Sequence, residues 1–153
     1  MAIRVVAHEE GVVGKVNWNR VLLGGVAAGL VMLVTEMFFF GFIFNEQMTA
    51  ALAALGKDFE SGGMDQFAYF VGYALVMGIT AVWLYAAIRP RYGAGTRTAM
   101  VAGLGVWALV FVSGGLGYAA NDLLPMSLIG ILVAVGLGES LLGAVVGAWL
   151  YRE

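Results

Sequence analysis

The stretch of sequence that decides the fold is MSLIGILVAVGLGESLLGAVVGAWL, residues 126–150. It contains a single charged side chain, Glu139, and it contains no proline. A helix of about 20 apolar residues is long enough to cross the ~30 Å hydrocarbon core of a bilayer. This stretch therefore predicts a membrane-spanning helix.

Three further apolar runs, at 21–44, 67–88 and 99–120, have the same character, and each of the four runs holds 22 to 25 residues. Apolar residues make up 61% of the chain and charged residues only 12%, a composition typical of membrane proteins. Transmembrane strands are shorter, about 9–11 residues of alternating polarity. The sequence thus predicts an all-α membrane protein, a bundle of four transmembrane helices in one domain, 1–153, with lipid as its surroundings.

The positive charges indicate an orientation. Seven of the eight Lys and Arg residues fall on one side of a four-span arrangement: Arg4, Lys15, Arg20, Arg89, Arg91, Arg97 and Arg152. Lys57 stands alone on the other side, among acidic residues. The positive-inside rule predicts that both termini are cytoplasmic. The tail 1–20 and the loop 89–98 would then face the cytoplasm, and the segment 45–66 and the turn 121–125 would be external.

The external segment 45–66 is long for a connection between packed helices. Met48, Ala51, Leu52 and Leu55 recur in it at helical spacing, and Gly56 follows as a plausible helix end. We expect a short amphipathic helix on the outer face, followed by a flexible stretch at 61–63, with a solvated loop as the alternative. Pro90 is expected to end the second spanning helix.

Two glutamates lie inside apolar runs, where a carboxylate is costly. Glu36 follows Arg20 by 16 residues, and Glu139 precedes Arg152 by 13. At about 1.5 Å per residue, both lie ~20–24 Å from the cytoplasmic side, at depths within about one helical turn of each other. Tyr73 and Ser113 fall at a similar depth. These four residues are predicted to form a polar layer, and a proton site, in the outer half of the bundle.

Glycines at helical spacing indicate which helix faces meet. Gly25 and Gly29 precede Glu36, and the fourth helix carries Gly136, Gly143 and Gly147 around Glu139. Small residues allow close helix approach, so we expect the first and fourth helices to pack through these faces, with both carboxylates pointing inward. Two neighbouring carboxylates cannot both stay ionised in a low dielectric, so at least one should hold a proton.

Three roles for the two glutamates stay open at this point. They could be protonated groups that hydrogen-bond helices together, they could share a proton or a cation, or a partner chain could supply a base. No Lys, Arg or His lies inside any of the four runs to neutralise them, because the only histidine, His8, is in the tail.

The sequence lacks the residues that several classes of functional site require. The spans contain no histidine or cysteine for ligating haem, chlorophyll or copper, so we expect no cofactor and no metal. No phosphate-binding loop, dinucleotide fingerprint or HExxH helix occurs, and the serines lack a base. The basic loop is too small for a nucleic-acid site. We expect a non-enzymatic protein, although a hydrolase using the glutamate pair stays open.

Three segments carry a resemblance: VNWNR at 16–20, QMTAAL at 47–52 and LGAVVGAW at 142–149. Together with the small-residue first helix, they resemble uncharacterised bacterial integral membrane proteins of four helices, which contain a domain of unknown function. Glu36 departs from the small or aromatic residues found at its position in those proteins. The resemblance implies a four-helix fold in the bacterial inner membrane and implies no activity.

Two hypotheses for function follow. In the first, the protein acts through helix packing, as a homo-oligomer or as an accessory subunit of a larger membrane complex. In the second, it is a proton- or cation-coupled transporter of a small solute that uses Glu36 and Glu139.

Overall fold

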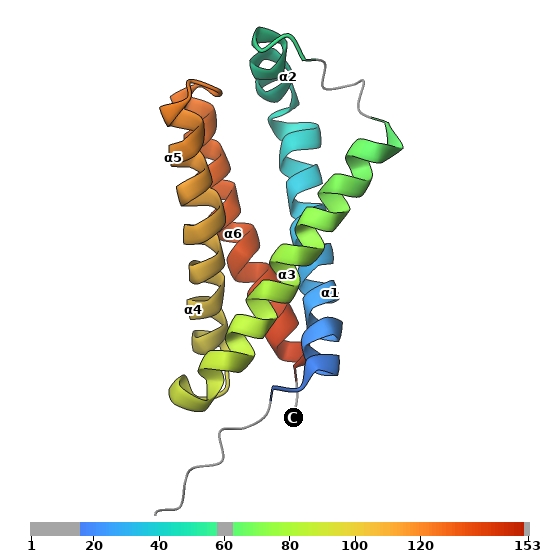
Figure 1. Cartoon of the computed structure of the whole chain (residues 1–153), viewed down its shortest axis with the longest axis vertical. Helices are drawn as coiled ribbons and strands as arrows, with labels where there is room; N and C mark the ends of the chain where they lie inside the picture. The colour runs from blue at the N-terminus through green and yellow to red at the C-terminus, as the bar shows by residue number, and fades with distance from the viewer. Residues whose placement is uncertain (1–15, 58–62, 152–153) are drawn as a thin grey trace, which may run out of the picture.

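The structure is a computed structural model that describes residues 16–57 and 63–151. Within these residues it is entirely helical, with four long columns (Figure 1). The elements in chain order are α1 (Trp18–Phe38), η1 (Phe39–Ile43), α2 (Asn45–Ala54), α3 (Met64–Tyr92), α4 (Thr96–Trp107), η2 (Ala108–Val112), α5 (Ser113–Ala120) and α6 (Met126–Leu150).

Four helical columns are long and apolar enough to cross a membrane: Trp18–Ile43, Met64–Tyr92, Thr96–Ala120 and Met126–Leu150. The predicted all-helical fold, with four helices long and apolar enough to span a membrane, is therefore confirmed for the described residues. The fourth column has the predicted bounds, and the others begin a few residues earlier than the apolar runs, because polar residues extend each helix beyond its hydrocarbon segment.

The prediction that Pro90 ends the second spanning helix is wrong. Helix α3 continues to Tyr92 and ends at Gly93, whose φ of 85° is the left-handed conformation that suits glycine. Proline disrupts a helix through its missing N–H and through a clash with the preceding turn. Only the last turn of α3 is affected here, so the helix passes through the proline and stops at the glycine.

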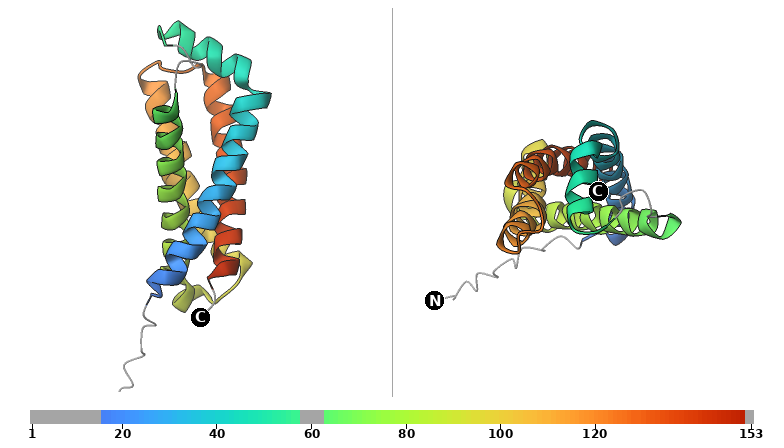
Figure 2. Two further views of the ribbon diagram at one scale, coloured as in Figure 1. Left: turned by 90° about the vertical axis from the view of Figure 1, so that its right-hand side faces the viewer. Right: turned by 90° about the horizontal axis from the view of Figure 1, so that it is seen from above.

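The segment 45–66 contains a helix, as predicted. In α2, Ala51 is buried, and Met48 and Leu52 are half-buried. Gly56 follows with a φ of 70°. Viewed from above, α2 lies across the end of the bundle (Figure 2). The predicted flexible residues 61–62, most of the tail 1–20, and Arg152 lie outside the described residues.

Two segments are π-helical, which the sequence analysis did not predict. η1 begins three residues after Glu36, and η2 interrupts the third column between α4 and α5. π-helical turns are rare, and they are frequent at functional sites. Both segments lie in the part of the bundle that contains the predicted polar layer.

Helix α1 begins and α6 ends at the same end of the bundle, and α2 caps the other end (Figure 1). We call the two parts of the bundle the termini half and the α2 half. Among the described basic residues, Arg20, Arg89, Arg91 and Arg97 lie at the end of the termini half, whereas Lys57 follows α2.

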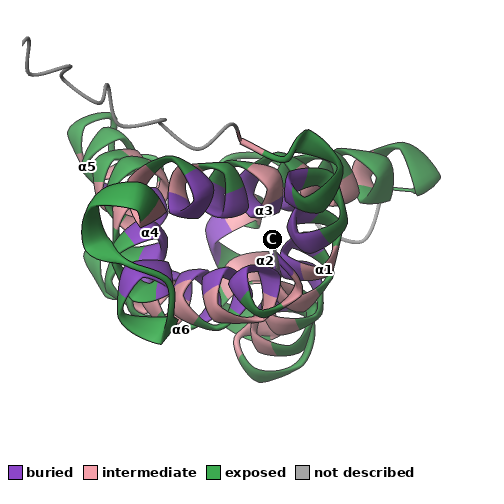
Figure 3. Cartoon of the chain, turned by 90° about the horizontal axis from the view of Figure 1, so that it is seen from below, coloured by how far each residue is buried: buried purple, intermediate pink, exposed green. Residues whose placement is uncertain are grey.

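Close helix packing defines the termini half. A Cβ atom added at Gly78 of α3 would collide with the backbone of Gly25 and Gly29 on α1. Gly24 of α1 meets Gly147 of α6 in the same way, with a Cβ at Gly24 only 2.5 Å from the Gly147 carbonyl oxygen. Buried faces of all four columns turn inward here (Figure 3), and Val21, Ala28, Val82, Ala99 and Ala102 form the core.

Two tyrosines join the helices at the end of the termini half. The Tyr151 hydroxyl accepts a hydrogen bond from the backbone N–H of Asn17 at 3.1 Å, and the Tyr85 hydroxyl accepts one from Gly95 at 3.3 Å. Their rings contact edge to face, with centroids 5.9 Å apart. Arg89 lies over the Tyr151 ring. The beginnings of α1 and α4 and the ends of α3 and α6 are thus linked.

Candidate functional site

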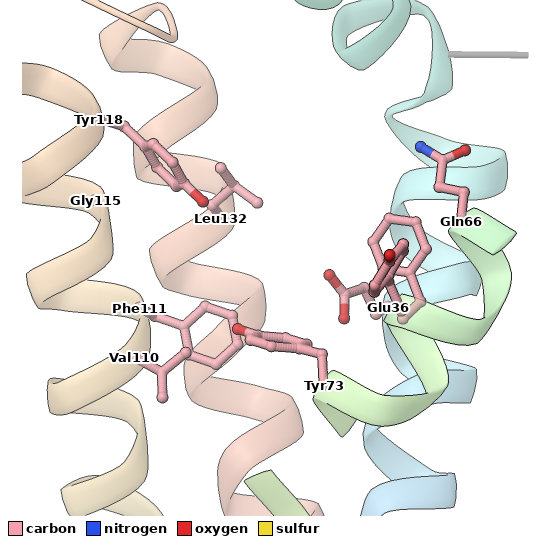
Figure 4. Close-up of a pocket in the computed structure, with 10 residues that line it drawn as sticks. Glu36, Gln66, Tyr73, Val110, Phe111, Gly115, Tyr118 and Leu132 are labelled. Carbon is pink, nitrogen blue, oxygen red and sulfur yellow. The ribbon is translucent and has the colours of Figure 1, made fainter. Parts of the chain in front are cut away.

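A cavity of about 340 Å³ lies in the α2 half, between α3 on one side and η2 and α5 on the other (Figure 4). Its lining combines one carboxylate, one amide, three tyrosines and several apolar side chains. The lining residues are Glu36, Gln66, Tyr69, Phe70, Tyr73, Val110, Phe111, Gly115, Tyr118 and Leu132. Each of the four helical columns contributes at least one of them.

The cavity exists because α3 diverges from α5 towards the α2 end (Figure 1). Where α3 packs closely, it presents Ala74 and Gly78 to α1. About one turn before Ala74 it carries the large rings of Phe70 and Tyr69. Small residues let helix backbones approach, and bulky rings keep them apart. The change from rings to small residues along α3 therefore sets where the bundle opens.

The Glu36 carboxyl projects from α1 into this space (Figure 4). The residue is half-buried. It lies seven residues after Gly29, on the face of α1 that packs against α3. Glu36 lines the cavity together with Gln66 and Phe70 of α3, so the cavity begins where the small-residue contact between α1 and α3 ends.

Glu139 of α6 is more deeply placed, with only 1% of its surface exposed. Its Oε1 atom is buried and has no hydrogen-bond partner among the described residues, and the same holds for Oγ of Ser140. A buried polar atom without a partner costs about 1–3 kcal/mol. Packing does not explain why α6 keeps a carboxyl group at this position.

The helix register gives the relative depth of the two glutamates. Gly24 lies against Gly147, and Ala28 contacts both Gly143 and Gly147. Continuing this antiparallel register places Met32 opposite Glu139. Glu36 is then one turn, or ~6 Å, nearer the α2 end. Glu36 and Glu139 are close enough for their charges to interact, and the Tyr73 hydroxyl is within the electrostatic range of both.

Three of the four residues predicted as a polar layer thus lie near one another, and Ser113 does not join them. Ser113 is exposed, and its hydroxyl donates a hydrogen bond to the Leu109 carbonyl one turn earlier in the same column. A serine can satisfy its hydroxyl within its own helix in this way. Depth alone placed Ser113 in the layer, but depth says nothing of which face a residue occupies.

The expected pairing of glycine faces is also wrong in part. Gly25 and Gly29 pack against Ile79 and Ala74 of α3, and not against the fourth helix. Gly143 and Gly147 do face α1, where they meet a second small-residue face formed by Gly24 and Ala28. Because adjacent residues on a helix point about 100° apart, α1 carries two glycine faces side by side, one for each neighbour.

The third predicted glycine of α6, Gly136, accommodates a ring. A Cβ atom there would collide with the ring of Phe111 from η2. The Phe111 ring, which lines the cavity, thus packs against the α6 backbone about one turn nearer the α2 end than Glu139.

The aromatic lining was not predicted. Gln66, Tyr69, Phe70 and Tyr73 recur on α3 at spacings of three and four residues, which places them on one helix face. This spacing is visible in the sequence and predicts an aromatic face on this helix. Phe111 and Tyr118 belong to the third column, and only the tertiary structure brings them opposite α3. The Tyr73 ring points from α3 towards Phe111 (Figure 4).

The residue types of this site can bind protons and cations. One carboxyl group, that of Glu36, and three phenols line the cavity, and none of the lining residues is basic. Glu139 lies within electrostatic range of Glu36. Within residues 16–57 and 63–151, no group of three or more His, Cys, Asp or Glu residues comes together as a metal site.

Searches against protein-family models, curated proteins and solved structures gave no match to this chain.

Proposed function

We propose that the protein is a proton-coupled membrane transporter of a small solute, and that Glu36 and Glu139 form its exchange site. The proposal adopts the second of the two hypotheses from the sequence. The single observation that carries it is the buried Glu139 Oε1, which has no hydrogen-bond partner among the described residues, within electrostatic range of Glu36, whose carboxyl lines the cavity.

The magnitudes favour an exchange site over structural hydrogen bonding. A carboxylate at the centre of a spanning helix costs about 2.5–3.5 kcal/mol on insertion scales. An interhelical hydrogen bond returns only ~0.6 kcal/mol on average, and Glu139 Oε1 makes none with the described residues. Retention of this group is better explained by a function in which it binds and releases a proton.

The two halves of the bundle supply the remaining parts of a transporter. The cavity is accessible from the α2 half, because Tyr69 and Tyr73 in its wall are both exposed, whereas the core of the termini half is closed by glycine packing and by the two tyrosine hydrogen bonds. Alternating access requires one side to be sealed while the other is open. The solute and the proton would compete for the same carboxylates, so uptake of one releases the other.

The charge distribution supports an orientation for this transporter. The basic residues gather at the end of the termini half, so the positive-inside rule places that end in the cytoplasm. The cavity would then lie in the external half of the bundle. The resemblance noted in the sequence supports the bacterial inner membrane as the location.

The other hypothesis, an accessory subunit or a homo-oligomer that acts through helix packing, rests on the same glycines. In the structure these glycines meet helices of the same chain. They are satisfied within the bundle and give no particular support to a partner.

The experiment is a flux measurement in proteoliposomes that contain a trapped pH-sensitive dye. A panel of cationic, neutral and anionic small solutes is added outside, and proton movement is followed. We expect at least one solute class to drive proton movement with the wild-type chain. The movement should fall to the level of empty liposomes in Glu36→Gln and in Glu139→Gln, because an amide keeps the shape but cannot exchange a proton.

The matched control is Glu46→Gln, which changes an exposed carboxylate of α2 outside the cavity and should leave the flux unchanged. If no solute in the panel moves protons at any pH through a correctly reconstituted wild-type chain, the transporter proposal is overturned. The same holds if both glutamine variants keep full flux.

A further inference from the structure

The cavity carries potential charge of one sign only. Glu36 lines it, Glu139 lies within electrostatic range of Glu36, and no Lys, Arg or His lies within any of the four apolar runs. An anionic solute would meet only acidic groups in a low-dielectric space, where like charges repel strongly. Electrostatics therefore favours a cation.

The wall opposite and beside the carboxylate is aromatic. Tyr69, Phe70 and Tyr73 come from α3, and Phe111 and Tyr118 come from the third column. Aromatic faces attract cations through their ring quadrupole, and aromatic walls of this kind are the established protein solution for quaternary ammonium groups. A calcium or magnesium ion would instead require about six to eight oxygen ligands, and two carboxylates do not supply such a set.

The position of the opening adds a second property. Helix α3 diverges from α5, and the residues along that gap are partly exposed, with Tyr73 at 39% and Tyr118 at 42%. The gap is in the side of the bundle, within spans apolar enough to cross a membrane. A solute that arrives through it comes out of the bilayer and must be soluble there. The cavity volume, about 340 Å³, is at the lower end of the range for small-molecule sites.

We propose that the solute is a hydrophobic organic cation, held with its charge near Glu36 and its apolar body against the tyrosine and phenylalanine rings, and reached from the bilayer through the gap between α3 and α5. This inference names the solute class of the exchange site, so it rests on the proposed function. It makes a prediction about binding that can be tested without any transport.

Binding should weaken on acidification. The groups that face Glu36 are Gln66, Tyr69 and Tyr73 from α3, Tyr118 from α5 and Glu139 from α6. Of these, only a glutamate carboxyl can lose a negative charge as the pH falls from neutral. Protonation removes the negative charge that attracts the cation, so the sign is a lower affinity at lower pH.

The test uses the full chain in detergent micelles and isothermal titration calorimetry, with empty micelles as the blank. Tetraphenylphosphonium is the probe, and tetraphenylborate, an anion of nearly the same shape, is its matched control. We expect saturable binding of the phosphonium and none of the borate. Equal binding of both ions would show that only hydrophobic partition occurs and would overturn the proposal.

Two variants locate the binding. Glu36→Gln should lower the affinity for tetraphenylphosphonium about tenfold or more, and Tyr73→Leu about three- to tenfold, while Tyr73→Phe keeps the ring and the affinity. If Glu36→Gln fails to fold, the comparison of Tyr73→Leu with Tyr73→Phe still decides the question. Unchanged affinity in Glu36→Gln and in Tyr73→Leu would place the cation elsewhere and overturn the proposal.

The two proposals fail separately. If tetraphenylphosphonium binds through Glu36 but drives no proton movement, the solute class stands and the transporter fails. If a neutral or anionic solute drives Glu36-dependent proton movement while tetraphenylphosphonium does not bind, the transporter stands and the cation inference is overturned.

Discussion

The termini half and the α2 half of this bundle both contain glycines, and the glycines of the two halves differ in what they contact. In the termini half, Gly24, Gly78 and Gly147 lie against backbone of a neighbouring helix, with no room for a Cβ atom. In the α2 half, Gly72, Gly114 and Gly117 have no side-chain neighbour within 4 Å of an added Cβ. Glycine frequency therefore says little about packing, because only the neighbouring residues decide whether a glycine brings helices together.

The comparison also explains where a polar site can exist. In the termini half the helices exclude everything except their own side chains. In the α2 half the rings of α3 and residues of η2 line a cavity between the columns. A site for a solute needs space, and a closed half next to it provides the seal. The difference between the halves is thus the structural basis of the proposed function.

The largest expected effect comes from adding one methyl group to α3 in each half of the bundle and comparing the two losses of stability. Gly78→Ala should lower the free energy of unfolding by about 3 kcal/mol, because overpacking in a tight interface costs about 1–3 kcal/mol and here the obstacle is backbone, which cannot rotate away. The control is Gly72→Ala on the same helix, which meets nothing within 4 Å and should cause no loss.

Stability in both variants is measured by titration with a denaturing detergent in mixed micelles, followed by helical circular dichroism. Equal losses for Gly78→Ala and Gly72→Ala would show that the two halves do not differ in packing.

The second prediction concerns the free energy of unfolding that is lost by burying the Glu139 carboxyl between the two halves. Glu139→Leu removes a buried oxygen that has no partner among the described residues, so it should raise the free energy of unfolding by about 1–3 kcal/mol. The same variant should lose proton movement. The detergent titration and the proteoliposome flux measure the two effects in parallel.

Stability and activity would then change in opposite directions, as expected where function retains an unfavourable group. A loss of stability in Glu139→Leu would instead indicate that the carboxyl makes a structural bond.

The smallest expected effect tests how much the Tyr151 hydrogen bond stabilises the termini half. Tyr151→Phe removes the hydroxyl that accepts the Asn17 N–H, and a hydrogen bond of this kind contributes about 1 kcal/mol. Tyr118→Phe in the α2 half is the matched change, because its hydroxyl faces the cavity, and it should leave stability unchanged. A thermal-shift measurement on both variants is sufficient, and a larger loss for Tyr118→Phe would reverse the assignment.

Much of the fold was predictable because hydrophobicity is a local property. Four apolar runs predicted four spanning helices, and α6 has the predicted bounds, 126–150. The spacing of Met48, Ala51 and Leu52 predicted α2. The two π-helical segments were not predictable by the same reasoning, because they depend on how a column fits its neighbours and not on its composition.

The candidate site was predictable in part. Counting from flanking arginines placed Glu36, Glu139 and Tyr73 at matched depth, and the structure brings these three together. The same counting placed Ser113 with them, although its side chain is exposed. Depth follows from the regular rise of a helix, but facing depends on how each helix is rotated about its axis, and packing with the neighbouring helices sets that rotation.

The sequence by itself determined four helices long and apolar enough to cross a membrane, with one carboxyl group inside the first and one inside the fourth. These features are readable because the cost of polar groups in lipid leaves a clear pattern along the chain. Only the tertiary structure decided that Gly25 and Gly29 face α3, that rings from α3, η2 and α5 surround Glu36, and that one half is closed while the other is open. These features arise from contacts between residues far apart in the chain, and such contacts depend on the shape of both partners.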